Sequence, residues 1–314
     1  MTVGDVMVDT LVHIPGTIRI DADNPAHMTR SLGGQAANTA AWLQISGARV
    51  HLVGVLGDDS AARWVRDRVS SLGIAHTLPS VPGPTGECVI VTSADGTRTM
   101  FPSSGANAHI GRTEVERELI ELIRGGPSHL HVSGYAACHD PTFVQRLLSH
   151  VAIEGVRTSL DSAALTSSTT IDHWRAAHLS VLPHIDVFLA TAQEIQSLRG
   201  LVAPVTLALD SATAVAEDLR GEASSGNWPD VVVMKVGELG AYVITATDVT
   251  HIPAHAKHAA DTTGAGDAFA AGFLAALARG SSAVESARNG ASVAAVAVTG
   301  IGGQPAIREG HHGG

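Results

Sequence analysis

The sequence is poor in cysteine, in aromatic residues and in positive charge. Its two cysteines, Cys88 and Cys138, match no metal-ligand spacing and define no disulfide framework. Aromatic residues make up 4% of the chain, and the formal net charge is −10. An acidic chain is a poor partner for nucleic acid or for an anionic membrane, so we expect neither. The 17 histidines are scattered and lack the spacing of a structural metal site.

Segments typical of membrane insertion or secretion are also missing. The longest uncharged span, 289–307, is interrupted by glycines and a proline, which favours a buried helix followed by a glycine turn. The stretch MTVGDVMVD has acidic residues and no basic region before an apolar run, unlike a secretory signal. Together with the low cysteine content, these features predict a cytoplasmic protein.

The sequence does contain a regular alternation of strand-like and helical segments. Strands are predicted at 1–8, 49–56, 130–132, 158–160, 187–190 and 230–236, and helices at 35–45, 61–72, 115–124, 142–153 and 268–278. Such alternation predicts parallel βαβ units, and therefore an α/β fold with helices on both faces of a mostly parallel sheet. We expect a single domain spanning 1–314.

Two regions break this alternation. Residues 11–30 and 77–102 contain short β-like pieces with proline and glycine, such as TIRI and ECVIVTS. We predict that they form a small β lid attached to the main sheet rather than a second domain.

The stretch DTTGAGDAFA, residues 261–270, places a glycine turn and a carboxylate at the start of an apolar helix. A helix N-terminus presents unpaired N–H groups and partial positive charge, and glycines let the backbone approach an anion closely. Gly264, Ala265 and Gly266 therefore form a candidate phosphate cradle. Asp267 would repel a phosphate, so it fits a general base acting on an attacking hydroxyl, with a simple first-turn helix acid as the alternative. No Walker loop is present.

Several stretches together resemble the ribokinase-like (PfkB) family of carbohydrate kinases. DTTGAGDAFAAGF is similar to the C-terminal signature of the family, and SLGGQAANTAAWLQISGARVHLVGVLGDD, residues 31–59, is similar to the N-terminal one. SGANAHI and VTGIGGQPAI also match, and all occur in family order over nearly the whole chain. The resemblance implies a ribokinase-like three-layer sandwich with a small β lid, and ATP-dependent phosphoryl transfer to a hydroxymethyl group of a sugar or related compound.

The resemblance also implies roles for matching residues. Asp267 matches the catalytic base, and the glycine turn at 264–266 matches the anion hole that stabilises the transferring phosphoryl group. The implied sugar pocket contains Asp9, Gly33, Gly34 and Asn38. Asp9 is predicted to end a strand, where an open α/β sheet binds its ligands.

On the nucleotide side, KVGELG resembles the K-x-G-x-x-G turn of the family near the ATP phosphates. This implies nucleotide contacts from Lys235, Gly237 and Gly240, although the bare pattern also describes an ordinary hairpin. FLATAQEIQSL resembles the N-x-x-E segment in which a glutamate, here Glu194, helps to hold Mg²⁺ through water. Thr191 replaces the asparagine and cannot reproduce its amide. A solvated first-turn acid is the alternative for Glu194.

The resemblance further implies a site for a monovalent cation, K⁺. Its expected residues are Asp261, Thr263, Ala297 and Gly302.

The residues define the acceptor less well. Ribokinase has Lys-Gly after its glycine pair, whereas this chain has Gln35 and Ala36. The lid-side arginines are Arg98, Arg19 and Arg30, and an arginine on a loop is usually solvated, so they do not predict a phosphorylated sugar. Nucleoside kinases of the family clamp the base with aromatic rings, and Phe101 is the obvious ring near the lid. We predict a sugar or sugar acid; a nucleoside kinase and a non-catalytic sugar- or nucleotide-binding protein are the alternatives. Pairing of two lids in a homodimer would cover exposed strand edges.

Overall fold

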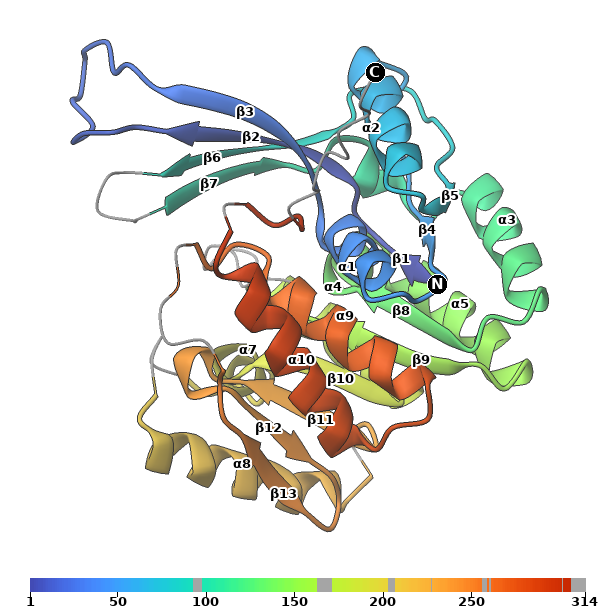
Figure 1. Cartoon of the computed structure of the whole chain (residues 1–314). Coiled ribbons are helices and arrows are strands. Elements are labelled where there is room, and N and C mark those ends of the chain that lie inside the picture. Colours follow the sequence, from blue (N-terminus) through green and yellow to red (C-terminus); the bar gives the residue numbers. More distant parts are fainter. Residues whose placement is uncertain are drawn as a thin grey trace.

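The computed structural model describes residues 1–92, 98–162, 171–202, 207–226, 228–255, 259, 261–300 and 302–305. Within them the strands form two sheets (Figure 1). The large sheet has the strand order β13-β12-β11-β10-β9-β8-β1-β4-β5 and the small sheet β3-β2-β6-β7. The large sheet is parallel except at one edge, where β12 (Ala241–Ile244) pairs antiparallel with β11 and with β13 (Val249–Ile252). The predicted α/β fold with a mostly parallel sheet is confirmed.

The parallel strands are short, and alternate side chains point to opposite faces of the sheet. They are β1 (Thr2–Val3), β4 (His51–Val53), β5 (Ala75–Thr77), β8 (His129–Ser133), β9 (Arg157–Asp161), β10 (Val187–Thr191) and β11 (Val231–Lys235). In β11, Val232 and Met234 pack into one apolar core while Val233 packs into the other. This two-sided burial explains why β10 and β11 read as nearly continuous apolar runs.

Helices cover both faces of the large sheet, as expected. One face carries α1 (Gln35–Ile45), α2 (Ser60–Ser71), α9 (Ala265–Ala278) and α10 (Ala283–Ala297). The other face carries α3 (Thr113–Arg124), α4 (Gly134–His139), α5 (Pro141–Ile153), α6 (Ile171–Val181), α7 (Ala192–Leu198) and α8 (Leu209–Ala223). In the part of the chain that the structure describes, none of the helices combines the length and apolar character needed to cross a membrane.

The small sheet is the predicted lid, and it projects from the body of the molecule (Figure 1). It consists of β2 (Met7–His13), β3 (His27–Gly33), β6 (Gly86–Thr92) and β7 (Arg98–Ser103). The strand pairing sets Asp9 opposite Cys88, and Cys88 opposite Pro102. The next row along these strands contains Thr10, Val89 and Phe101, which therefore point to the other face of the lid.

Two sequence predictions about this region are wrong. The strand predicted at 1–8 is divided: β1 pairs in the large sheet, and the chain then leaves that sheet at Gly4 and enters the lid as β2. TIRI, residues 17–20, is not a strand but part of the connection between β2 and β3. There Asn24 Oδ1 accepts a hydrogen bond from Arg19 N, and the Arg19 guanidinium donates to the carbonyl of Asp23, so local side-chain bonds replace strand pairing.

Candidate active site

The predicted glycine turn forms the start of α9. Gly264 precedes the helix with φ of 72°, and a Cβ atom on it would lie 2.5 Å from the Cα of Gly303. Glycine avoids both the left-handed strain and this collision. Among the described residues no side chain caps α9. The N–H groups of Gly264 and Gly266 remain available for an anion, whereas that of Ala265 donates to the carbonyl of Thr262 over 3.3 Å.

Asp267 is the third residue of α9, and its carboxylate lies against α1. Its Oδ2 accepts a hydrogen bond of 2.8 Å from Asn38 Nδ2, and Asn38 Oδ1 accepts one of 2.6 Å from Gln304 Nε2. Burial raises the pKa of Asp267 to about 8, although the hydrogen bond from Asn38 acts in the opposite direction. A carboxyl group whose pKa is near neutral can take up and release a proton at physiological pH.

The predicted acceptor residues Asp9, Gly33 and Gly34 meet where the lid joins α1. A Cβ atom on Gly33 would lie 2.1 Å from Cγ of Asp9, so the backbone at Gly33 contacts this carboxylate directly. Burial, with a smaller contribution from the charge of Asp5, raises the pKa of Asp9 to about 7. The prediction that Asp9 ends a strand is wrong: it lies inside β2, because the chain has already passed from the large sheet into the lid.

Asp5 is a buried residue of this region that the sequence analysis does not identify. Its Oδ2 accepts a hydrogen bond of 2.8 Å from the backbone N–H of Gln35, and its Oδ1 accepts one of 2.6 Å from Ser133 Oγ. Gln35 Nε2 donates to the carbonyl of Ser162 over 3.1 Å. These bonds fix the first turn of α1 against the ends of β8 and β9. Because the sequence analysis predicts one strand over 1–8, Asp5 reads as an interior strand residue, and its position gives no local signal.

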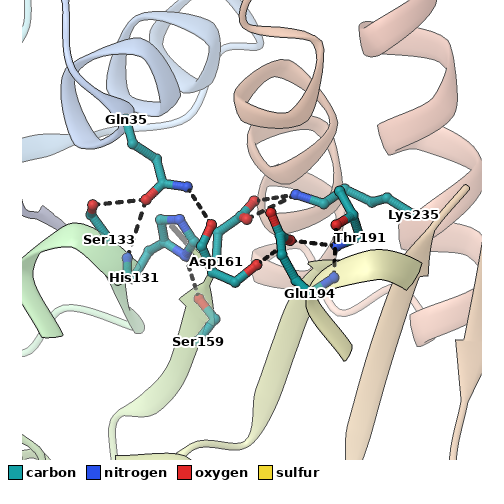
Figure 2. A network of polar contacts seen from close by, with 10 residues as sticks. Gln35, His131, Ser133, Ser159, Asp161, Thr191, Glu194 and Lys235 are labelled. Atoms are coloured by element: carbon teal, nitrogen blue, oxygen red, sulfur yellow. Dashed lines mark hydrogen bonds and ion pairs between the residues drawn. The ribbon is translucent and has the colours of Figure 1, made fainter. Parts of the chain in front are cut away.

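A charged network lies at the carboxyl ends of β9, β10 and β11 (Figure 2). Lys235 ends β11, and its Nζ donates to both carboxylate oxygens of Asp161, the last residue of β9, over 2.8 Å each. Burial raises the pKa of Asp161 to about 6, so the carboxylate is ionised at neutral pH. Burial alone would lower the pKa of Lys235, but the neighbouring carboxylates outweigh it, and this pKa lies above its usual value.

The network reaches the glycine turn. A Cβ atom on Gly266 would lie 3.4 Å from Lys235 Nζ, so the ammonium group stands beside the start of α9. The two glycines of the predicted nucleotide turn follow β11. Gly237 begins a short 3-10 helix (Gly237–Leu239), and Gly240 follows its last residue. The structure therefore brings a fixed positive charge, a helix N-terminus and a carboxylate of raised pKa together at the ends of parallel strands, where open α/β sheets bind ligands.

Comparison with known proteins identifies the family of this chain. Residues 1–309 match the model of the pfkB family of carbohydrate kinases. The chain belongs to this family. It is 24% identical to a fructokinase of Salmonella typhimurium over 277 residues, which cover 88% of this chain and 83% of the relative. The chain is therefore an ATP-dependent carbohydrate kinase, an enzyme whose site holds a nucleotide and a hydroxyl acceptor together.

Solved structures agree with the family assignment at the level of the fold. A probable sugar kinase from Rhizobium etli superimposes with a TM-score of 0.79 at 22% identity, covering 98% of this chain and 94% of the other. An adenosine kinase from Sinorhizobium meliloti gives 0.77 at 22% identity, covering 98% and 95%. The fold is therefore ribokinase-like. Because one neighbour is named a sugar kinase and the other an adenosine kinase, they do not identify the acceptor of this chain.

ATP-dependent pfkB kinases work with a divalent metal ion, and the residues near Glu194 fit one held through water. Glu194 forms a capping box with Thr191 at the start of α7: its Oε2 accepts from Thr191 N over 2.6 Å, and Thr191 Oγ1 accepts from Glu194 N over 3.2 Å. Ser162 Oγ also donates to this Oε2. Within the described residues no donor is assigned to Oε1, so one carboxylate oxygen stays available to a hydrated ion.

The carboxylate expected to help hold a monovalent cation already accepts several hydrogen bonds. Oδ1 of Asp261 accepts from the N–H of Thr263 at 2.8 Å and from its hydroxyl at 2.7 Å, and Oδ2 accepts from Gly302 N at 2.9 Å. Arg98 from the lid adds a third donor to Oδ1. The carbonyl of Ala297, at the end of α10, accepts from Gly300 N. A guanidinium group therefore contacts the carboxylate of the predicted K⁺ site.

Proposed function

We propose that this pfkB kinase transfers a phosphoryl group from ATP to a hydroxymethyl group of an unphosphorylated sugar or sugar acid. The observation that carries the proposal is the position of Asp267, a carboxylate of raised pKa in the first turn of α9, next to the uncapped glycine turn. In this role Asp267 takes the proton of the attacking hydroxyl, while the N–H groups of Gly264 and Gly266 bind the phosphoryl oxygens.

The acceptor is held from the opposite side of the site. Asp9 accepts hydrogen bonds from the hydroxyl groups of the acceptor, and the backbone at Gly33 and Gly34 allows the sugar to approach closely. Asn38 already donates to Asp267, so its proposed role is to orient the base as well as to contact the sugar. A sugar fits such a set of polar groups, because its hydroxyls both donate and accept hydrogen bonds.

The nucleotide lies, in this proposal, over the ends of β10 and β11. Lys235 places its charge beside the phosphates, and Gly237 and Gly240 let the chain turn closely around the nucleotide. A Mg²⁺ ion held through water by Glu194 would neutralise phosphate charge as the reaction proceeds. Thr191, which caps α7 through its side chain, presents no amide to the nucleotide and contributes mainly by fixing Glu194.

The strand register of the lid favours a sugar over a nucleoside. Phe101, the ring expected to stack on a base, shares a row with Thr10 and Val89 and points away from the face that carries Asp9. This outer face exposes two large apolar side chains, Met28 and Phe101, which are 68% and 58% exposed. We propose that two lids pair through this face in a homodimer.

A coupled ADP-release assay tests the proposed function. The purified protein is given Mg·ATP and a panel containing ribose, fructose, 2-keto-3-deoxygluconate, adenosine, other nucleosides and fructose phosphates. We expect one unphosphorylated sugar or sugar acid to exceed the rate without acceptor. A nucleoside as the best acceptor would overturn the acceptor class but leave the phosphoryl transfer intact.

The role of Asp267 is tested with Asp267→Asn. We expect turnover to fall by about 10²- to 10⁴-fold with acceptor binding retained, because only the proton transfer is lost. Asp210→Asn, which changes an exposed first-turn acid of α8, is the matched control and should keep the wild-type rate. Unchanged turnover in Asp267→Asn would exclude this residue as the base.

A further inference from the structure

Arg98 is the first residue of lid strand β7, and its side chain crosses from the lid to the loop that precedes the glycine turn. Its Nη1 lies 3.2 Å from Asp261 Oδ1, 2.7 Å from Thr262 Oγ1 and 3.2 Å from Thr263 Oγ1. These are three consecutive residues, and Gly264 follows them directly. One guanidinium group therefore ties the lid to the segment that leads into α9.

The strand register explains how Arg98 reaches this loop. In the lid Arg98 pairs with Thr92, and Thr92 with His13. Counting along β2 by steps of two places this row on the same face as Asp9. Arg98 thus points toward the active site, in contrast to Phe101 on the same strand.

The carboxylate that pairs with Arg98 belongs to Asp261, and it also connects two segments of the backbone. Asp261 accepts bonds from Thr263 in the loop and from Gly302 in the segment that lies against Gly264 through Gly303. The side chain of Asp261 is 13% exposed and that of Arg98 is 36% exposed. A buried carboxylate with several donors stays charged, and a neighbouring positive charge stabilises it further.

We propose that Arg98 is a positioning residue that makes turnover independent of a monovalent cation. It supplies the fixed positive charge beside Asp261. It also holds the loop 261–263 and the glycine turn in their active geometry when the lid is in place. This inference rests on the proposed phosphoryl transfer. The phosphate-binding N–H groups begin directly after the loop, so a shift of the loop moves them away from the transferring group. Displacements of about 1 Å in such groups can cost about 100-fold in rate.

The test compares wild type, Arg98→Ala and Arg98→Lys in KCl and in tetramethylammonium chloride at equal ionic strength. Arg117→Ala is the control, because it removes an exposed arginine from α3, which lies on the opposite face of the large sheet from α9. Two quantities are measured: kcat with the best acceptor, and hydrogen exchange of the backbone N–H groups of residues 262–266 without substrate. The exchange measurement does not depend on activity.

We expect wild type and Arg117→Ala to give equal rates in both salts. Arg98→Ala should lose about 10- to 100-fold in kcat in tetramethylammonium, exchange faster at 262–266, and recover part of both in KCl or in guanidinium chloride at low millimolar concentration. The kcat and the exchange rate of Arg98→Lys should lie between those of wild type and Arg98→Ala, since lysine keeps the charge but not the planar group.

Three results would overturn the proposal. They are a wild type stimulated by K⁺, an Arg98→Ala variant indistinguishable from wild type in rate and exchange, and an impaired Arg98→Ala variant that neither cation restores. If wild type phosphorylates no acceptor, the proposed function fails, whereas the exchange data still decide whether Arg98 positions the loop.

Discussion

Replacing Asp267 by asparagine should make the protein more stable although it strongly lowers turnover, and the gain in stability should grow with pH. The folded-state pKa of Asp267 is about 8, raised from 3.8 by burial. The folded protein therefore keeps this proton over a pH range in which the unfolded chain has lost it. The contribution to stability is fully present below about pH 4 and is lost as the pH rises through about 8. Asparagine carries no such penalty.

The size of the effect follows from the same shift. Each pKa unit is worth about 1.4 kcal/mol, so the full shift sets an upper limit of about 6 kcal/mol above pH 8. Asp267 is partly open to solvent, which screens the charge, and we expect roughly a third of this limit. Asp267→Asn should then gain about 0.5 kcal/mol at pH 5 and about 2 kcal/mol at pH 8.5. The second value corresponds to a rise of about 5 °C in Tm.

Urea unfolding of both proteins at pH 5 and pH 8.5 measures this difference. The hydrogen bond from Asn38 survives in the variant, because an asparagine oxygen can still accept it, so the comparison isolates the charge. Asp210→Asn again serves as control, with no pH-dependent gain expected. An equal difference at both pH values, or a variant less stable than wild type at pH 8.5, would refute the reasoning.

Three further changes test the site. Lys235→Met should cost about 3 kcal/mol in urea unfolding because it leaves the buried Asp161 unpaired, and adding Asp161→Asn should restore most of it; no restoration would disprove their coupling. Gly264→Ala should lose about 1–3 kcal/mol of stability and lower kcat through left-handed strain and contact with Gly303, whereas Gly300→Ala, with ordinary contacts, should lose neither. Asp9→Asn should raise the acceptor KM about tenfold by weakening one charged hydrogen bond, and an unchanged KM would remove Asp9 from the acceptor site.

Local sequence patterns determined the helices and the glycine turn well. The helix predicted at 35–45 is α1 with the same bounds, and the helix predicted from 268 begins three residues earlier, at Ala265, so that Asp267 lies in its first turn. Such features depend on interactions between near neighbours in the chain: apolar spacing, glycine conformations and N-terminal N–H groups. The two family signatures also lie in these segments, which is why the kinase assignment could be predicted.

The division of the first strand could not be predicted, because an apolar run does not show which sheet it pairs with. Residues 1–8 read as one strand, yet β1 lies between β4 and β8 while β2 pairs with β3 and β6. This division moved Asp9 from a strand end into the lid. It also turned Phe101 away from the site, because strand register decides the face on which each side chain lies.

The sequence by itself determined the α/β class, the glycine turn before α9 and the carboxylate next to it, since each depends on a short stretch of neighbouring residues. The tertiary structure alone decided the charge pairs around them. Lys235 meets Asp161 across 74 positions of the chain, and Arg98 meets Asp261 across 163. Contacts of this kind depend on strand order and on the placement of the lid over the sheet, and these are set by the packing of the whole chain rather than by any local pattern.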